Sequence, residues 1–201
     1  DLEILNGEVA RCREILASLA RDPSAGADPA VSKMTFGALV TDMAARYGVA
    51  DTTVLVTAKA SIDPPLIKRS PELVQGLGNL IENATEFART QVNLEFTWDE
   101  DQVELSISDD GPGFAANILG LLGDPYISTR PGSGRMGLGV FISKTLLERT
   151  GAHLHFFNRR QGMGATVVIR WPRHIIDLAE NDSGFGTEAG RRLQQASQGE
   201  Y

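Results

Sequence analysis

The order of sequence patterns between Pro71 and Gly113 constrains the fold of this chain more than any other feature. Ser70 is a typical helix N-cap and Pro71 suits a first helical turn, so a helix is predicted over residues 71–88. One face of this helix is apolar, and two segments with alternating apolar residues follow it. The members of these patterns are Leu73, Leu77, Leu80, Ile81, Ala84 and Ala88 in the helix, Val92, Leu94 and Phe96 in the first segment, and Val103, Leu105 and Ile107 in the second. The alternation predicts a hairpin that is covered on one side.

Other patterns add helices and strands to this unit. Helices are predicted over residues 36–47 and 138–149, followed by the C-cap glycines Gly48 and Gly151. Strands are predicted over residues 53–57, 153–157 and 165–171, with a turn at 63–65 and a long loop over 115–136. The chain after Pro172 is polar and Gly-rich, and we expect a short helix there at most. The fold class predicted is a two-layer α/β sandwich, with one mixed sheet covered by helices on one face.

The first twenty residues follow a different pattern. Leu5, Val9, Cys12, Leu16 and Leu19 recur at spacings of four and three, which is typical of a coiled-coil seam that needs a partner helix. We therefore divide the chain into an N-terminal helix (1–21), a linker (22–34), a globular domain (35–173) and a tail (174–201). The chain begins at Asp1 within a helical pattern, so we expect it to be part of a longer protein.

Composition narrows the class of protein. The chain has 201 residues, which is enough for one full hydrophobic core. Its net charge of −7 argues against a general nucleic-acid-binding surface. Its single cysteine excludes an internal disulfide framework. No apolar run approaches the ~18 residues needed to span a bilayer.

The polar face of the 71–88 helix carries Asn79 and Asn83, which lie one turn apart. Amide oxygens suit Mg²⁺ when the ion also binds phosphates and water. Taken alone, the two residues are more typical of a solvated helix face than of a metal site.

Asp109 ends the second alternating segment and is followed by Gly111 and Gly113. A carboxylate at a strand end, beside glycines that let a ligand approach the backbone, suits recognition of an amino-purine edge. A plain turn is the alternative, because Asp-Gly and Pro-Gly are common turn pairs.

A second glycine string occurs at Gly132, Gly134 and Gly137. It does not follow a strand, as a dinucleotide-binding fingerprint would, and the chain lacks a GxxxxGK[ST] phosphate loop. We instead assign a phosphate-binding role to Gly137, Leu138 and Gly139, at the N-terminus of the next helix.

This ordered set of motifs resembles the nucleotide site of the GHKL ATPases, and most closely that of sensor histidine kinases. The resemblance covers about residues 36–172 and implies that ATP and Mg²⁺ bind here. It assigns the Mg²⁺ ligand to Asn83, the adenine amine contact to Asp109, and the last glycine box to residues 162–166, with the Thr166 hydroxyl near the site. Residues 115–136 correspond to the ATP lid and contain Tyr126 and Arg130, although a solvated Arg130 is equally compatible with the pattern.

The same resemblance indicates which reaction the site performs, phosphotransfer or ATP hydrolysis. Asn79 matches the position at which other GHKL branches carry a catalytic Glu, which favours transfer over ATP hydrolysis. Glu82 precedes the Mg²⁺ Asn and is expected to orient or deprotonate an acceptor imidazole. The family motif usually has Asn where this chain has Asp110.

Three further segments resemble redox-responsive sensor kinases of the RegB/PrrB type. They are residues 11–16, 82–88 and 124–130. In that family a cysteine in the dimerisation helix is a redox switch. Cys12 lies between Arg11 and Arg13, which could lower the pKa of its thiol, but a small residue packed in the seam is an equal alternative.

The resemblance implies the catalytic ATP-binding domain of a sensor histidine kinase, joined to the second helix of its dimerisation hairpin. The phosphoacceptor should lie outside this chain, since His153, His155 and His174 do not fit that role. The expected partners are a response regulator and a second copy of the chain, bound through the N-terminal helix. We expect a cytoplasmic location, with membrane anchoring only through segments absent here. A non-catalytic GHKL binding module and a GHKL hydrolase are the alternatives.

Overall fold

The structure is a computed structural model that describes residues 33–47, 52–60, 62–123, 139–159 and 164–178. The N-terminal helix and most of the linker and tail predicted above lie outside these residues. The elements in chain order are β1 (Lys33–Thr35), α2 (Phe36–Tyr47), β2 (Thr53–Lys59), β3 (Leu66–Lys68), α3 (Pro71–Phe87), β4 (Gln91–Trp98), β5 (Gln102–Asp109), a 3-10 turn η2 (Leu119–Leu121), α4 (Gly139–Arg149), β6 (His153–Asn158), β7 (Ala165–Pro172) and α5 (Arg173–Ile176).

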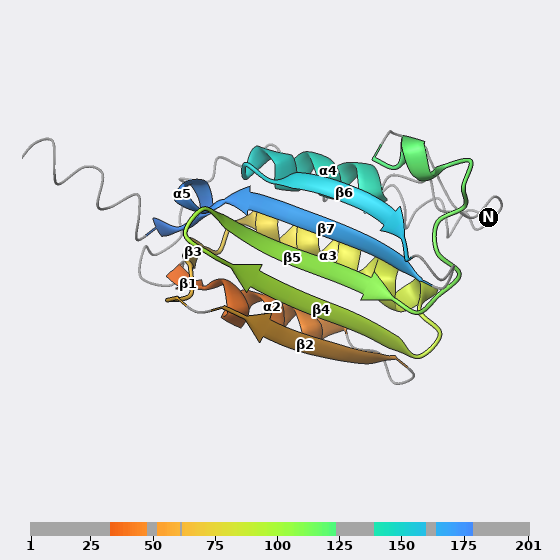
Figure 1. The fold of residues 1–201 in the computed structure, drawn as a ribbon, viewed down its shortest axis with the longest axis horizontal. Helices are drawn as coiled ribbons and strands as arrows, with labels where there is room; N and C mark the ends of the chain where they lie inside the picture. Colours follow the sequence, from red (N-terminus) through yellow and green to blue (C-terminus); the bar gives the residue numbers. More distant parts are fainter. Residues whose placement is uncertain (1–32, 48–51, 61, 124–138, 160–163, 179–201) are drawn as a thin grey trace, which may run out of the picture.

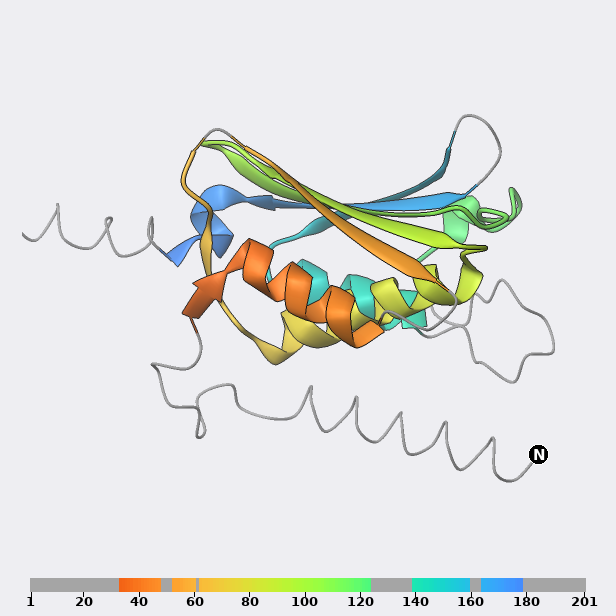
Figure 2. The same ribbon diagram turned by 90° about the horizontal axis from the view of Figure 1, so that it is seen from below.

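One mixed sheet forms the first layer of the structure. Its strand order is β2-β4-β5-β7-β6, with β2 parallel to β4 and every other pair antiparallel. Figures 1 and 2 show α2, α3 and α4 on the same face of this sheet. The predicted two-layer α/β sandwich is therefore confirmed.

The sheet and helices meet through the apolar residues that the alternation identifies. On β4 and β5 the buried and partly exposed residues alternate, so each strand turns one face to the helices. Phe36 makes edge-to-face contacts with Phe96 and Trp171, at ring-centroid distances of 6.2 and 5.4 Å. These rings join α2 to strands on both sides of β5.

The central helix α3 begins where the sequence predicts. The Ser70 hydroxyl accepts a hydrogen bond from the Leu73 N–H at 3.2 Å, and Pro71 occupies the first turn. A Cβ at Gly76 would lie 2.7 Å from Leu147 Cγ, and a Cβ at Gly78 would lie 2.5 Å from the Tyr47 hydroxyl. The two glycines thus allow α3 to pack closely between α4 and α2.

Two short strands were not predicted. β1 pairs antiparallel with β3, and the Phe36 N–H donates to the Pro65 carbonyl at 3.0 Å. Residues 63–65, predicted as a turn, lead directly into β3. Strands of three residues are too short to show a period, and long-range pairing stabilises them. Strand β2 also extends to Lys59, beyond the predicted end at residue 57.

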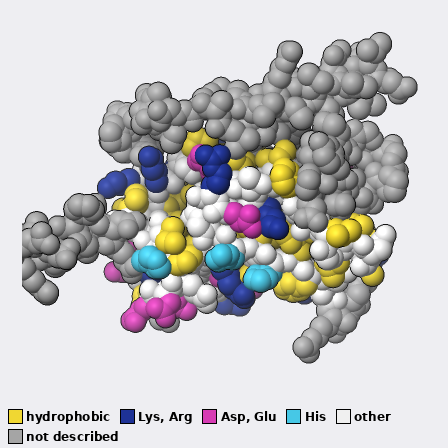
Figure 3. All heavy atoms as spheres, turned by 90° about the horizontal axis from the view of Figure 1, so that it is seen from above, with side chains coloured by type: hydrophobic (Ala, Val, Ile, Leu, Met, Phe, Trp, Pro, Cys, Tyr) yellow, Lys and Arg dark blue, Asp and Glu magenta, His cyan; other side chains and the backbone are white. Residues whose placement is uncertain are grey.

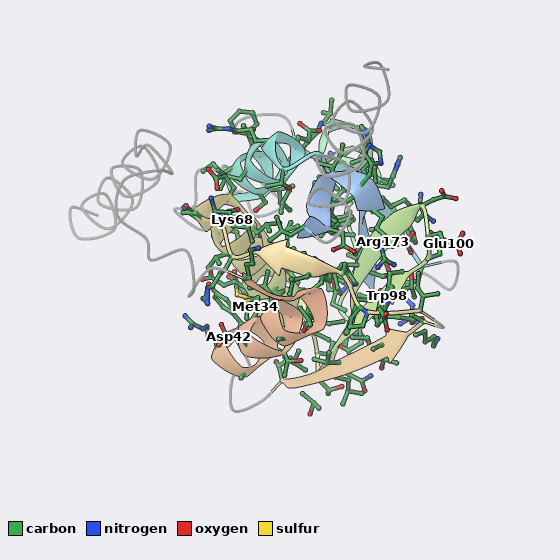
Figure 4. The ribbon with its side chains drawn as sticks, turned by 90° about the vertical axis from the view of Figure 1, so that its left-hand side faces the viewer. Met34, Asp42, Lys68, Trp98, Glu100 and Arg173 are labelled. Atoms are coloured by element: carbon green, nitrogen blue, oxygen red, sulfur yellow. The ribbon has the colours of Figure 1, made fainter. Side chains whose placement is uncertain are left out.

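The end of the sheet near α5 is closed by a buried ion pair. The Arg173 guanidinium contacts Asp177 Oδ2 at 3.0 Å and donates to the carbonyls of Asp99 and Asp63. Asp177 also accepts a hydrogen bond from the Leu66 N–H. Figure 4 shows Arg173 at this end, near Trp98 and Glu100. Arg173 therefore ties the short helix α5 to the β4–β5 turn and to the segment before β3.

Among the described residues, no helix is both long and apolar enough to cross a membrane.

We expect Arg173→Ala to lower the free energy of unfolding by about 3 kcal/mol, because it leaves the buried Asp177 carboxylate without its cation. Urea unfolding measures this loss. Arg170→Ala is the matched control, since Arg170 pairs with Glu104 on the exposed face and should cost about 1 kcal/mol or less. Equal losses in the two variants would contradict the role assigned to Arg173.

Candidate nucleotide site

The candidate site is built around the Asp109 carboxylate, at the end of the central strand β5. Asp109 is only 5% exposed, and its Oδ1 accepts hydrogen bonds from the N–H groups of Gly111 at 2.8 Å and Ala165 at 3.2 Å. Burial raises the pKa of Asp109, and the two N–H donors only partly offset that effect. The arrangement presents a buried carboxylate at the sheet end where α3 runs into β4 (Figure 1).

Glycines allow the backbone to approach closely around Asp109. A Cβ at Gly111 would overlap the Phe87 carbonyl oxygen, and a Cβ at Gly164 would overlap the Asp109 carbonyl oxygen. Gly164 also has φ +97°, which disfavours other residues. The glycines at positions 111 and 164 are therefore needed for packing against the protein's own backbone.

The neighbouring Asp110 binds the loop between α3 and β4. Its carboxylate accepts hydrogen bonds from the N–H groups of Arg89, Thr90 and Gln91 and from the Thr90 hydroxyl. Desolvation opposes the ionised form, but the Thr90 and backbone donors outweigh it and hold the pKa of Asp110 well below its usual range. Asp110 thus fastens the α3–β4 loop to the end of β5.

The polar face of α3 lies partly exposed beside the start of α4. Asn79, Glu82 and Asn83 all lie on this face and are neither fully buried nor fully exposed. A Cβ at Gly139 would lie 3.6 Å from Asn83 Nδ2, so the Asn83 amide is next to the first residue of α4. The structure therefore brings together a predicted Mg²⁺ ligand and a helix N-terminus suited to phosphates.

Thr166 requires a correction. Its hydroxyl forms a hydrogen bond with the Ser108 hydroxyl at 3.0 Å, and Ser108 points to the sheet face opposite Asp109 because side chains alternate along β5. The contact near Asp109 comes from the backbone N–H of Ala165, one residue earlier. We missed Ala165 because a backbone donor leaves no side-chain signal; only its place directly after Gly164 points to it.

The remaining predicted site residues have different outcomes. Gly113 follows Gly111 in the turn after Asp109, with φ +80°. Tyr126, Arg130, Gly137, Leu138 and Cys12 lie outside the described residues, so their roles stay predictions.

The three histidines lie on β6 and α5, and all are exposed, as expected of surface residues. Figure 3 shows histidine side chains on the surface of this part of the molecule.

Comparison with known proteins agrees with this geometry. Residues 68–175, more than half of the chain, match the family described as Histidine kinase-, DNA gyrase B-, and HSP90-like ATPase. The chain belongs to this ATPase family. The match contains Asn83, Asp109 and Gly139, and the family name makes ATP the ligand that the match supports.

Two curated relatives indicate the branch of the ATPase family. The chain is 36% identical over 205 residues to the sensor histidine kinase RegB of Cereibacter sphaeroides. The aligned region covers 90% of this chain and 44% of the relative. It is 35% identical over 112 residues to the sensor protein kinase PilS of Pseudomonas aeruginosa, covering 52% of this chain and 21% of the relative. The chain therefore spans less than half the length of these relatives.

Solved structures support the same fold. Full-length ShkA in complex with AMPPNP aligns with a TM-score of 0.60 at 22% identity, covering 79% of this chain and 34% of that chain. The mycobacterial sensor histidine kinase MprB aligns with a TM-score of 0.57 at 20% identity, covering 70% of this chain and 97% of that chain.

The Asp110 contacts generate a prediction about pH. We expect Asp110→Asn to lower the free energy of unfolding by about 1 kcal/mol near pH 7, because an amide has one acceptor oxygen and no charge. A lowered folded-state pKa stabilises the fold above the ordinary carboxyl pKa, and this contribution is lost as the pH falls toward the lowered value. The deficit of the variant in urea unfolding should thus stay constant from about pH 7 to about pH 5 and narrow between about pH 5 and about pH 3, as the pH falls below the ordinary carboxyl pKa.

The control for this measurement is Asp101→Asn, in the turn directly before β5, where Asp101 is exposed. It should leave the unfolding free energy close to that of the wild type. A deficit for Asp110→Asn that stays constant with pH would contradict the charge-based role.

Proposed function

We propose that this chain is the ATP-binding catalytic part of a two-component sensor histidine kinase. It transfers the γ-phosphate of Mg-ATP to a histidine outside this chain, from which the phosphate passes to a response regulator. The observation that carries the proposal is the placement of Asn83 beside the start of α4, with the buried Asp109 carboxylate at the same end of the sheet. The similarity to RegB and PilS supports the kinase branch of the family.

The residues present fit a magnesium nucleotide. Asp109 accepts a hydrogen bond from the adenine amine, and the N–H groups of Gly111 and Ala165 keep its carboxylate oriented. Asn83 supplies an amide oxygen to Mg²⁺, and the first turn of α4 supplies N–H groups to phosphates. When bound, the metal neutralises negative charge on the phosphates. Asn83 and Gly139 are adjacent, so metal and phosphate ligands come from neighbouring helices.

The chemistry of α3 favours transfer over hydrolysis. Asn79 carries an amide, which does not accept a proton from an attacking water as a carboxylate does. Glu82 lies on the same polar face and orients the acceptor imidazole or takes its proton. Transfer to an incoming histidine is therefore the reaction that this helix supports.

The wider setting is proposed from the relatives. The N-terminal helix at 1–21 pairs with a second copy of the chain, and the domain works in the cytoplasm, with any membrane anchor in other segments. Redox sensing through Cys12 belongs to the same proposal.

Transfer of labelled γ-phosphate tests the function. The chain is incubated with Mg-ATP and the histidine-containing acceptor hairpin of the full-length protein, and acid-labile phosphate on the hairpin is measured. We expect labelling. ATP binding without labelling would favour a non-catalytic binding module, and phosphate release without the acceptor would favour a hydrolase.

The same assay tests whether Asp109 binds the nucleotide or only stabilises the fold. Asp109→Asn keeps an acceptor oxygen for Gly111 and Ala165 but is expected to lower transfer at subsaturating ATP by about tenfold or more, because a charge-assisted hydrogen bond to ligand is lost. Asp101→Asn, in the turn that precedes the other end of β5, should transfer at the wild-type rate.

A further inference from the structure

We propose that Asn158 is a positioning residue of the nucleotide site. It holds the turn of residues 111–114 in place beside Asp109. The inference rests on the nucleotide site proposed above, and it assigns a task to a residue that no motif of the sequence identifies.

Asn158, the last residue of β6, binds the backbone of Phe114 at two points. Its Oδ1 accepts a hydrogen bond from the Phe114 N–H at 2.7 Å, and its Nδ2 donates to the Phe114 carbonyl at 2.7 Å. This pairing uses both ends of the carboxamide, so it requires a donor and an acceptor on one planar group. Aspartate lacks the donor, and alanine lacks both groups.

The position of Asn158 in the sheet places this contact next to the site. Asn158 pairs with Ala165 across β6 and β7, and the Ala165 N–H donates to Asp109 on β5. The three residues therefore lie side by side at one end of the sheet. The turn that leaves Asp109 crosses the end of β7 and reaches β6, where Asn158 binds it.

The turn is held at both of its ends. At its start, Asp109 Oδ1 accepts the Gly111 N–H, and at its end Asn158 binds Phe114. Between these points, Gly113 has φ +80°, and a Cβ there would lie 2.7 Å from Asn158 Oδ1. The glycine thus leaves room for the Asn158 carboxamide, and the two residues depend on each other.

A ring contact completes the attachment. The Phe114 ring meets the Phe156 ring edge to face, at a centroid distance of 6.1 Å. Phe114 is therefore fixed to β6 through its backbone and its side chain. A turn held this way keeps the shape that binds ligand before the ligand arrives, so less affinity is lost to ordering it.

The test compares Asn158→Ala with Asn93→Ala. Asn93 is also half-buried near a strand end, but it pairs with Ser108 and faces the opposite side of the sheet. Two measurements are made: the Kd for Mg-ATP and for ADP by calorimetry, and hydrogen exchange of residues 110–118 in the nucleotide-free protein. Thermal unfolding confirms that each variant is folded at the assay temperature.

For Asn158→Ala we expect faster exchange over residues 110–118 and an affinity about tenfold lower, by a similar factor for Mg-ATP and ADP, because two neutral hydrogen bonds are lost. Asn158→Asp keeps the side-chain shape and should show the same two effects. Asn93→Ala should show neither.

Wild-type affinity in both Asn158 variants, or a loss of affinity without faster exchange, would overturn the positioning role. Failure of the wild-type chain to bind nucleotide would instead contradict the proposed function, and the exchange measurement would still report on the contact between Asn158 and the turn.

Discussion

The structure around the site depends on one buried carboxylate. Asp109 ends the central strand with almost no exposure to solvent, and the backbone N–H groups directed at its carboxyl group offset part of the cost of burying it. Those donors come from Gly111 on one side and Ala165 on the other. Their approach requires glycine at positions 111 and 164, since a Cβ at either would overlap a backbone oxygen. The carboxylate and the glycine motifs around it are therefore parts of one arrangement.

The two ends of the sheet differ in the polar contacts that they carry. At one end, Arg173 and Asp177 form a buried ion pair that joins α5 to the β4–β5 turn, and this end is filled by the protein's own groups. At the other end, Asp109, Asn83 and the first residue of α4 place polar groups near backbone that packs closely at Gly111 and Gly164. Asp110 and Asn158 bind the backbone of loops at this second end.

The sequence was a good guide where regular periodicity determines structure. Helix α2 and the start of α3 agree with prediction because their apolar positions and caps are local signals. β1 and β3 were missed since only pairing between distant residues stabilises such short strands. The motif identifies Asp109, which the structure places buried at the end of β5, and its role in binding stays a prediction. The Thr166 hydroxyl was expected near the site, but it bonds to Ser108 on the opposite sheet face, because a motif match does not specify which way a side chain alternates. Asn158 carries no motif, and its task depends on contacts formed only after folding.

The central claim is that nucleotide binds at the Asp109 end, on the face of the sheet that the helices cover. The most direct measurement is an NMR titration of the isotope-labelled chain with Mg-ATP. We expect the largest shift changes at the backbone N–H groups of Gly111, Ala165 and Gly139 and at the side-chain amide of Asn83. Changes confined to the opposite sheet face, at Ser106 and Val168, would contradict the claim.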